Sequence, residues 1–140
     1  MTRIRTFALV LAGALALAAA PAAAQDFKVV ANGDVEISKA DLAKVFLKQT
    51  SKLPDGTSAK PVDQGKGSAV RAAFSQAVLG RAVGAVEQYW QQQIFSGKDA
   101  PPPTKGSDDE IVAWVKATPG AIGYVSAGAS TAGVKVVTVK

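Results

Sequence analysis

One segment of the chain, Asp63 to Ser68, combines residue types that can bind an anion. It reads Asp-Gln-Gly-Lys-Gly-Ser, and Arg71 follows three residues after the serine. Ser68 stands where a helix should begin; the first N–H groups of a helix have no intrahelical partner, and its dipole adds about half a positive charge there. Glycines let the backbone approach a ligand closely, while Lys66 and Arg71 add positive charge. The segment is therefore a candidate oxyanion site.

The same residues also fit a plainer interpretation. Ser68 is a good helix N-cap in its own right, and Lys66 and Arg71 could be ordinary solvated side chains. The segment is not a Walker A loop, because it lacks the four residues that separate the two glycines of that motif. The residue types alone leave the cap and the ligand site both open.

Composition excludes several kinds of active site. The 140 residues contain no His and no Cys, so histidine metal sites, thiolate nucleophiles and Ser-His-Asp triads are impossible. Three consecutive acidic residues, Asp108 to Glu110, point about 100° apart on a helix, and we expect them to stabilise its start rather than converge on a metal. We therefore expect no metal, no cofactor and no enzyme activity, and a phosphate-ester hydrolase is disfavoured.

The first 24 residues have the pattern of a cleavable secretory signal peptide. Arg3 and Arg5 give a positive start, and residues 7–20 form an uncharged apolar run. That run is shorter than the roughly 20 residues that span a bilayer, which disfavours an uncleaved anchor. Pro21 then breaks the helix, and Ala22 to Ala24 offer the small side chains that signal peptidase accepts. We expect export, and a periplasmic location.

Residues 25–140 are long enough for one domain with a single core. Two of the 16 basic residues lie in the leader, which leaves 14 against 11 acidic residues and a net charge of about +3. This small excess favours small anions over cations. It is too dispersed to indicate nucleic acid, which usually requires a concentrated basic stripe.

Apolar periodicity predicts alternating strands and helices. Strands are expected at 27–31, 60–63, 121–125 and 134–139, and helices at 39–48, 68–80, 83–97 and 107–118. Ser38, Ser68 and Ser107 stand at the expected N-caps. Residues 98–105, with three consecutive prolines, should form an extended loop. This order of elements indicates an α/β domain with a partly parallel sheet.

Spacing also predicts which helix faces are buried. In the third helix the residues that fall three and four apart are Val83, Val86, Trp90 and Ile94. In the fourth helix the corresponding residues are Ile111, Trp114 and Val115. Both tryptophans are expected in the core rather than stacked on a ligand.

Four segments resemble the substrate-binding proteins of bacterial phosphate ABC importers, and together they cover nearly the whole chain after the leader. "ISKADLAKVFLKQTSKLPDGTSAKPVD", 37–63, is similar to that family's helix, turn and strand before the ligand loop. "GSAVRAAF", 67–74, resembles its Gly-Ser-Gly-Thr-Arg helix start, and "IVAWVKATPGAIGYVSAGAS", 111–130, resembles its Thr-Pro-Gly and Ile-Gly-Tyr-Val region. "YWQQQIFSG", 89–97, is similar to a feature of short exported proteins of the superfamily.

The resemblance implies a fold and a ligand. The fold is α/β, a three-layer single lobe of a type II periplasmic-binding-protein fold with a mixed, partly parallel sheet. The ligand is a small, phosphate-like oxyanion held by backbone amides and a serine. The residues implied as the ligand set are Gln64, Lys66, Gly67, Ser68, Ala69, Val70 and Arg71.

The chain departs from the family at this set. Ala69 and Val70 replace the family's Gly and Thr, while Gln64 and Lys66 replace its Arg and Asp. A full member has two lobes that close over the ligand, whereas residues 25–140 supply one, so binding is expected to be weak.

The function expected is that of an exported solute-binding protein of phosphate-binding type, with an ABC permease or another envelope protein as a possible partner. The alternative is a periplasmic protein-interaction module that has lost its ligand. Such a module would dock another envelope protein through its sheet edge or open cleft. Neither nucleic acid nor a membrane span after leader removal is expected.

Overall fold

The computed structural model describes residues 26–140, so the predicted signal peptide lies outside the described residues. The centre of the molecule is a four-stranded mixed sheet in the order β3-β6-β1-β7. Strand β1 (Phe27–Ala31) is antiparallel both to β6 (Ala121–Ser126) and to β7 (Lys135–Val136), while β3 (Lys60–Pro61) is parallel to β6. The prediction of a partly parallel sheet is confirmed.

Two short parallel pairs flank this sheet. Strand β2 (Glu36–Ile37) pairs with β8 (Thr138–Val139), and β4 (Asp63–Gln64) pairs with β5 (Thr104–Lys105). The prediction of a loop throughout 98–105 is therefore wrong at its end, because β4 provides Thr104–Lys105 with a pairing edge.

The prediction of one final strand over 134–139 is also wrong. The segment divides at Val137, which is buried and donates its N–H to the carbonyl of Val29. Strand β7 therefore lies beside β1, and β8 continues to a different partner, β2.

Four α-helices occur in the described part, close to their predicted positions: α1 (Lys39–Phe46), α2 (Ala69–Phe74), α3 (Val83–Phe95) and α4 (Asp108–Ala117). The predicted caps are confirmed, because the hydroxyls of Ser38, Ser68 and Ser107 each accept the N–H of the residue three positions later. Helix α2 continues directly into η1 (Ser75–Leu79), a π-helical segment that the sequence did not predict. Gly80, with φ of +64°, ends it as expected.

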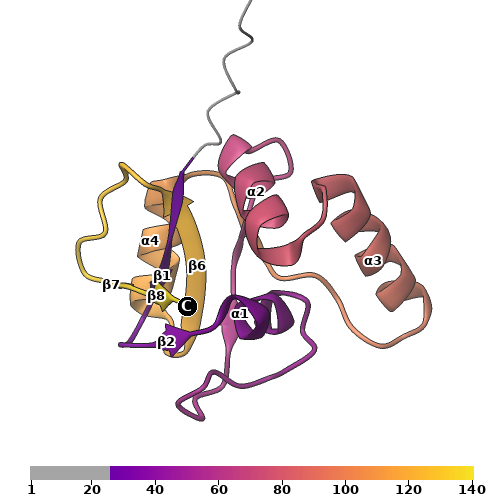
Figure 1. Cartoon of the computed structure of the whole chain (residues 1–140), viewed down its shortest axis with the longest axis horizontal. Helices are drawn as coiled ribbons and strands as arrows, with labels where there is room; N and C mark the ends of the chain where they lie inside the picture. The colour runs from indigo at the N-terminus through magenta and orange to yellow at the C-terminus, as the bar shows by residue number, and fades with distance from the viewer. Residues whose placement is uncertain (1–25) are drawn as a thin grey trace, which may run out of the picture.

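The helices cover both faces of the sheet (Figure 1). Ile122 and Tyr124 of β6 point to one face, where α1, α2 and η1 supply the larger apolar cluster. Val125 of β6 points to the opposite face and packs with Ile111 and Val115 of α4. The alternation of side chains along β6 thus places one core on each side, as expected from strand geometry.

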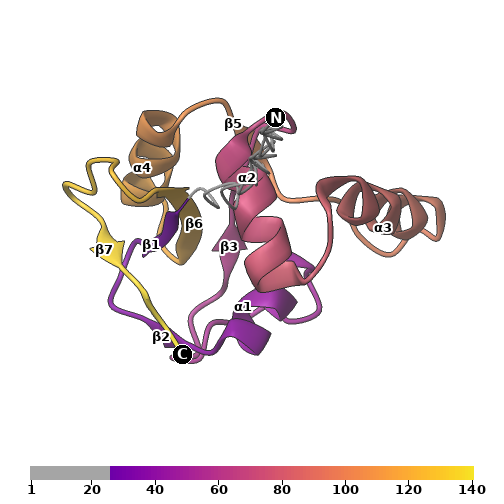
Figure 2. The same cartoon turned by 45° about the horizontal axis from the view of Figure 1, so that its top comes forward.

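Helix α3 lies beyond α2, away from the sheet, in both Figure 1 and Figure 2. Val86 and Trp90 are buried as predicted, and the Tyr89 hydroxyl donates to the carbonyl of Leu47 at 2.8 Å. Ile94, however, is 57% exposed. That prediction is wrong because the last turn of α3 extends past the packed part of the domain, so the Ile94 side chain is only partly covered.

Trp114 of α4 is only partly buried, at the margin of the smaller cluster. The prediction that it belongs to the core is therefore only partly correct.

None of the helices in residues 26–140 is long and apolar enough to cross a membrane.

Candidate functional site

The candidate segment is held in place on both sides by backbone hydrogen bonds. Asp63 N–H donates to the carbonyl of Pro103 at 2.9 Å, and Gly65 N–H donates to that of Lys105 at 3.1 Å. The turn then closes with Ser68 N–H on the carbonyl of Gly65 at 3.0 Å. Residues 98–105, which contain the three consecutive prolines and are called the proline segment below, therefore fix where α2 begins.

The start of α2 faces the surface. Ser68 Oγ accepts the N–H of Arg71 at 3.3 Å, which leaves the hydroxyl hydrogen free to donate. Gly67 is exposed, and a Cβ built on it would meet no atom within 4 Å. Ala69 is exposed as well, and the first amides of a helix have no intrahelical acceptor. These groups can meet a ligand from solvent.

Arg71 does not point to that surface in the way a ligand residue would. It is 9% exposed, its Nη1 donates to the carbonyl of Gln64 at 3.2 Å, and its Nε lies 3.7 Å from Asp63 Oδ1. Two of the three guanidinium nitrogens thus contact residues of β4.

The side chains of Gln64 and Val70 are also buried. Gln64 Nε2 donates to Asp108 Oδ1 at 2.7 Å and to the carbonyl of Tyr124 at 3.1 Å. Val70 packs in the larger core cluster with Phe74. The predicted set is therefore divided: Lys66, Gly67, Ser68 and Ala69 lie together at the surface, while the side chains of Gln64, Val70 and Arg71 face inward.

Lys66 is paired with α3. Its Nζ lies 3.2 Å from Glu87 Oε2, and the lysine side chain is 77% exposed. An exposed pair of this kind contributes about 0–1 kcal/mol. Lys66 can therefore leave Glu87 for another anion at little cost.

Asp63, a buried acid, begins the candidate segment but was not assigned to the ligand set from the sequence. Its carboxylate accepts the Tyr124 hydroxyl and the N–H of Gln64, the latter at 3.1 Å, beside the Arg71 guanidinium. Burial raises the pKa of Asp63, and the Tyr124 hydrogen bond and the Arg71 charge oppose that rise. Burial, followed by the negative charge of Asp63, raises the pKa of Tyr124. Tyr124 is 61 residues away, so no local sequence pattern joins them.

Asp108 does more than stabilise the start of α4. Its Oδ1 accepts Gln64 Nε2 and, at 3.1 Å, the N–H of Ser126. Burial alone would raise the pKa of Asp108, but the hydrogen bonds from Gln64 and Ser126 outweigh it and lower the pKa. Within residues 26–140, no three acidic side chains are grouped as a metal site.

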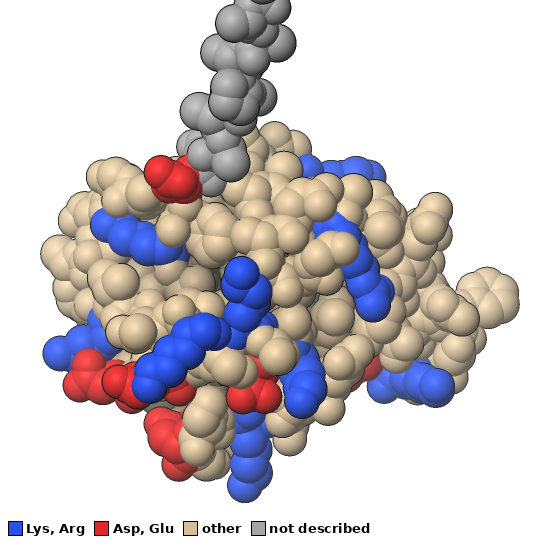
Figure 3. Space-filling view, in the orientation of Figure 1, with Lys and Arg blue, Asp and Glu red and all other residues tan. Residues whose placement is uncertain are grey.

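Charge is mixed rather than strongly positive on the face of the molecule shown in Figure 3, where basic and acidic side chains both occur. A cavity of about 460 Å³ lies beside the site, between α3 and the proline segment, and Lys66 and Arg71 contribute to its lining. A second hollow, of about 570 Å³, lies elsewhere, along α1 and the turn at Leu53.

By sequence, the chain matches no protein-family model and no curated protein. By structure, it is similar to PstS from Borrelia burgdorferi, with a TM-score of 0.64, 13% identity and coverage of 83% of this chain and 47% of that one. A putative phosphate ABC transporter substrate-binding protein with bound phosphate, from Clostridium perfringens, has a TM-score of 0.63 and 16% identity, and the match covers 82% of this chain and 45% of that one. An ABC-type phosphate transport receptor from Vibrio cholerae has a TM-score of 0.63 and 16% identity, with coverage of 82% of this chain and 46% of that one.

The chain spans less than half the length of each of these proteins. At such identities the likeness concerns the fold. The described residues therefore form a mixed α/β structure whose fold is similar to part of each of these solved structures.

Proposed function

We propose that the chain is an exported solute-binding protein that holds a small oxyanion weakly at the start of α2. The observation that supports this most directly is the open N-terminus of α2, where the Ser68 hydroxyl hydrogen is free to donate. The fold likeness adds support, because two of the similar proteins are named for phosphate transport and one of these contains bound phosphate.

The donors proposed for the anion are the amides of Gly67 and Ala69, the Ser68 hydroxyl and the Lys66 ammonium group. Each bond to a charged oxygen contributes about 1.5–3 kcal/mol net, and association costs at least about 4 kcal/mol in lost freedom. An affinity near millimolar, about 4 kcal/mol, is the expected balance. Only one side of the anion would be covered.

Export by the leader, residues 1–24, to the periplasm is part of the proposal, as is delivery of the anion to an ABC permease. Expression of the full chain followed by fractionation of the envelope tests the location. Recovery of uncleaved chain in the cytoplasm would contradict it.

Amide chemical shifts of the protein, purified after expression of the full chain, test the binding. Titration with inorganic phosphate should move the signals of Gly67, Ser68 and Ala69 along saturating curves in the millimolar range. No movement at these amides by tens of millimolar phosphate would refute the site.

A matched pair of variants separates ligand binding from helix capping. Ser68→Ala and Ser38→Ala each remove an N-cap hydroxyl, with a cost of about 1 kcal/mol of stability. Only Ser68→Ala should abolish the phosphate response. Arg71→Ala is a poor test, because it leaves the carboxylate of Asp63 without its buried cation.

A further inference from the structure

We propose that the cleft between α3 and the proline segment binds a small organic monocarboxylate with a flat apolar body. This cleft, the α3 cleft, is the cavity of about 460 Å³ whose apolar lining includes Trp90, Ile94 and Pro101–Pro103. Its volume lies within the roughly 300–1,000 Å³ of small-molecule sites. The inference goes beyond the oxyanion proposal, because the surfaces of α3 and the prolines carry it.

The walls of the α3 cleft are rigid and apolar. Trp90, which is only 4% exposed, contributes to one wall, and Pro101–Pro103, of which Pro102 is buried, form the opposite wall, held by the bond from Asp63 N–H to the carbonyl of Pro103. The exposed pyrrolidine rings of Pro101 and Pro103 offer rigid apolar surfaces that lose little conformational entropy when they are covered. A flat apolar body matches such walls better than a flexible chain does.

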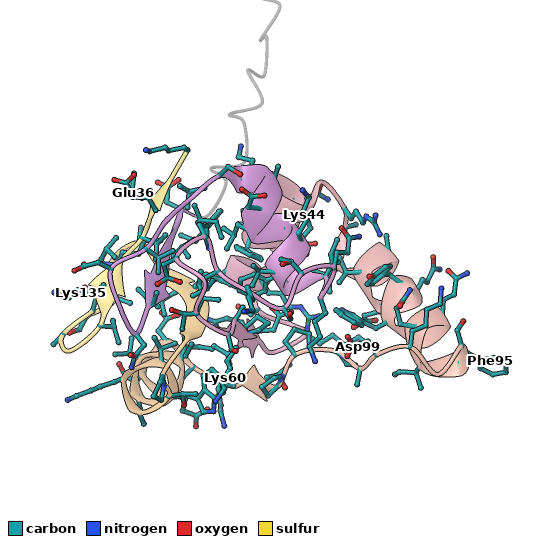
Figure 4. All side chains as sticks on the ribbon, turned by 90° about the horizontal axis from the view of Figure 1, so that it is seen from below. Glu36, Lys44, Lys60, Phe95, Asp99 and Lys135 are labelled. Atoms are coloured by element: carbon teal, nitrogen blue, oxygen red, sulfur yellow. The ribbon has the colours of Figure 1, made fainter. Side chains whose placement is uncertain are left out.

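The two exposed hydrophobic residues at the end of α3 differ in position. Ile94 lines the α3 cleft. Phe95 is 97% exposed and projects from the tip of the helix, away from the domain (Figure 4). Because only Ile94 faces the cleft, the pair offers a built-in comparison between a lining residue and its neighbour.

A hydrogen-bond donor reaches the floor of the cleft. Arg71 Nη1 and Nε are engaged by Gln64 and Asp63, and no hydrogen bond among the described residues uses Nη2. Every side-chain nitrogen or oxygen of residues 26–140 that is completely shut off from solvent has a hydrogen-bond partner, so Nη2 keeps at least a small contact with solvent. The surface that Arg71 lines is the α3 cleft. A carboxylate is the natural acceptor for a guanidinium N–H.

The charges of the cleft favour one negative charge rather than two. Its lining contains two basic residues, Lys66 and Arg71, and two acidic ones, Asp63 and Glu87. Asp63 is already compensated by Arg71, and Lys66 is free to exchange its exposed contact with Glu87. A monocarboxylate can therefore accept from Nη2 and Lys66, whereas the lining holds no third basic side chain to neutralise a second negative charge.

Intrinsic fluorescence provides the assay, because the chain has two tryptophans and only Trp90 lines the α3 cleft. In Trp114→Phe, produced from the full chain, phenylacetate should change the Trp90 emission with millimolar saturation. Phenylacetamide, which lacks the charge, should bind at least fivefold more weakly, and acetate, which lacks the ring, should give no response. Equal responses to phenylacetate and either control would overturn the proposal.

Two variants locate the effect. Ile94→Ala should weaken phenylacetate binding about fivefold, and Phe95→Ala should leave it unchanged; equal effects would place the ligand elsewhere. Inorganic phosphate distinguishes this proposal from the previous one. A phosphate response at Ser68 without a phenylacetate response refutes the α3 cleft alone, and the converse refutes the oxyanion site alone.

Discussion

Replacing Tyr124 by Phe tests the buried polar network that supports the site. The hydroxyl of Tyr124 donates to Asp63 and accepts the N–H of Gln64 at 3.2 Å. The ring stacks on Phe74 with the centroids 3.9 Å apart, and a Phe ring can keep this contact. The substitution therefore removes the polar contacts with little change in packing.

The expected loss follows from the charge of the acceptor. A hydrogen bond to a charged group contributes about 1.5–3 kcal/mol, against about 0.5–1.5 kcal/mol for a neutral one. Asp63 retains Arg71 and the N–H of Gln64, so we expect Tyr124→Phe to lower the free energy of unfolding by about 2–3 kcal/mol. At about 4 °C per kcal/mol for a domain of this size, Tm falls by about 8–12 °C.

Tyr89→Phe is the matched control. Its hydroxyl donates to one neutral acceptor, the carbonyl of Leu47, at 2.8 Å, so the expected loss is about 1 kcal/mol. Urea denaturation at neutral pH measures both variants. A loss for Tyr124→Phe no larger than that for Tyr89→Phe would refute the view that the hydroxyl stabilises a buried carboxylate.

The loss should also depend on pH. The pKa of Asp63 in the folded protein lies above the ordinary value of 3.8, so the folded state binds more protons than the unfolded state as pH rises through this range, and stability declines there. Tyr124→Phe removes a group that lowers this pKa, so the decline becomes larger and extends to higher pH. The difference between the variant and the parent should be smallest below pH 4 and grow toward pH 7.

Two further predictions use matched neighbours. Asp108→Ala removes the acceptor of two hydrogen bonds and should lower the free energy of unfolding by about 2–3 kcal/mol. Asp109→Ala, on the exposed first turn of α4, should lower it by less than about 1 kcal/mol. Similar losses for the two variants in urea denaturation would contradict the view that Asp108 links α4 to β4 and β6. Gly120→Ala places a Cβ in a clash with the carbonyl oxygen of Ser58 at a φ of +78°, and should cost about 3–4 kcal/mol in urea denaturation. Gly80→Ala, with φ of +64° and no atom within 4 Å, should cost only the strain of about 1–2 kcal/mol.

Much of the fold could be predicted because its signals are local. The N-cap serines mark the starts of α1, α2 and α4, and each cap hydrogen bond joins residues only three positions apart. Gly80 marks the end of η1 in the same local way. The errors concern tertiary context. The spacing of α3 indicated that Ile94 is buried, but the sequence does not show how far along a helix the rest of the domain covers its apolar face. Likewise, the alternation in 134–139 did not reveal that Val137 separates two partners.

The site divides in the same way. The Ser68 cap is local and was predicted, whereas the partners of Asp63 and Gln64 lie 61 and 44 residues away. Arg71 lies three residues from Ser68, and this proximity suggested a ligand residue. The neighbouring strand β4 offers its guanidinium a carboxylate and a carbonyl instead.

These contacts also bear on which oxyanion the start of α2 would prefer. Backbone amides and a hydroxyl donate equally well to phosphate and to sulfate, so discrimination needs an acceptor for the proton that phosphate carries. The nearby acids are Asp63, which is buried against Tyr124 and Arg71, and Glu87, which is paired with Lys66. We therefore expect dissociation constants for phosphate and sulfate within about threefold at neutral pH, because Asp63 is engaged in its buried contacts and Glu87 is not among the groups proposed to contact the anion. A preference of tenfold or more for phosphate, about 1.4 kcal/mol, would mean that one of these acids reaches the ligand; Glu87→Gln would identify it by abolishing the preference.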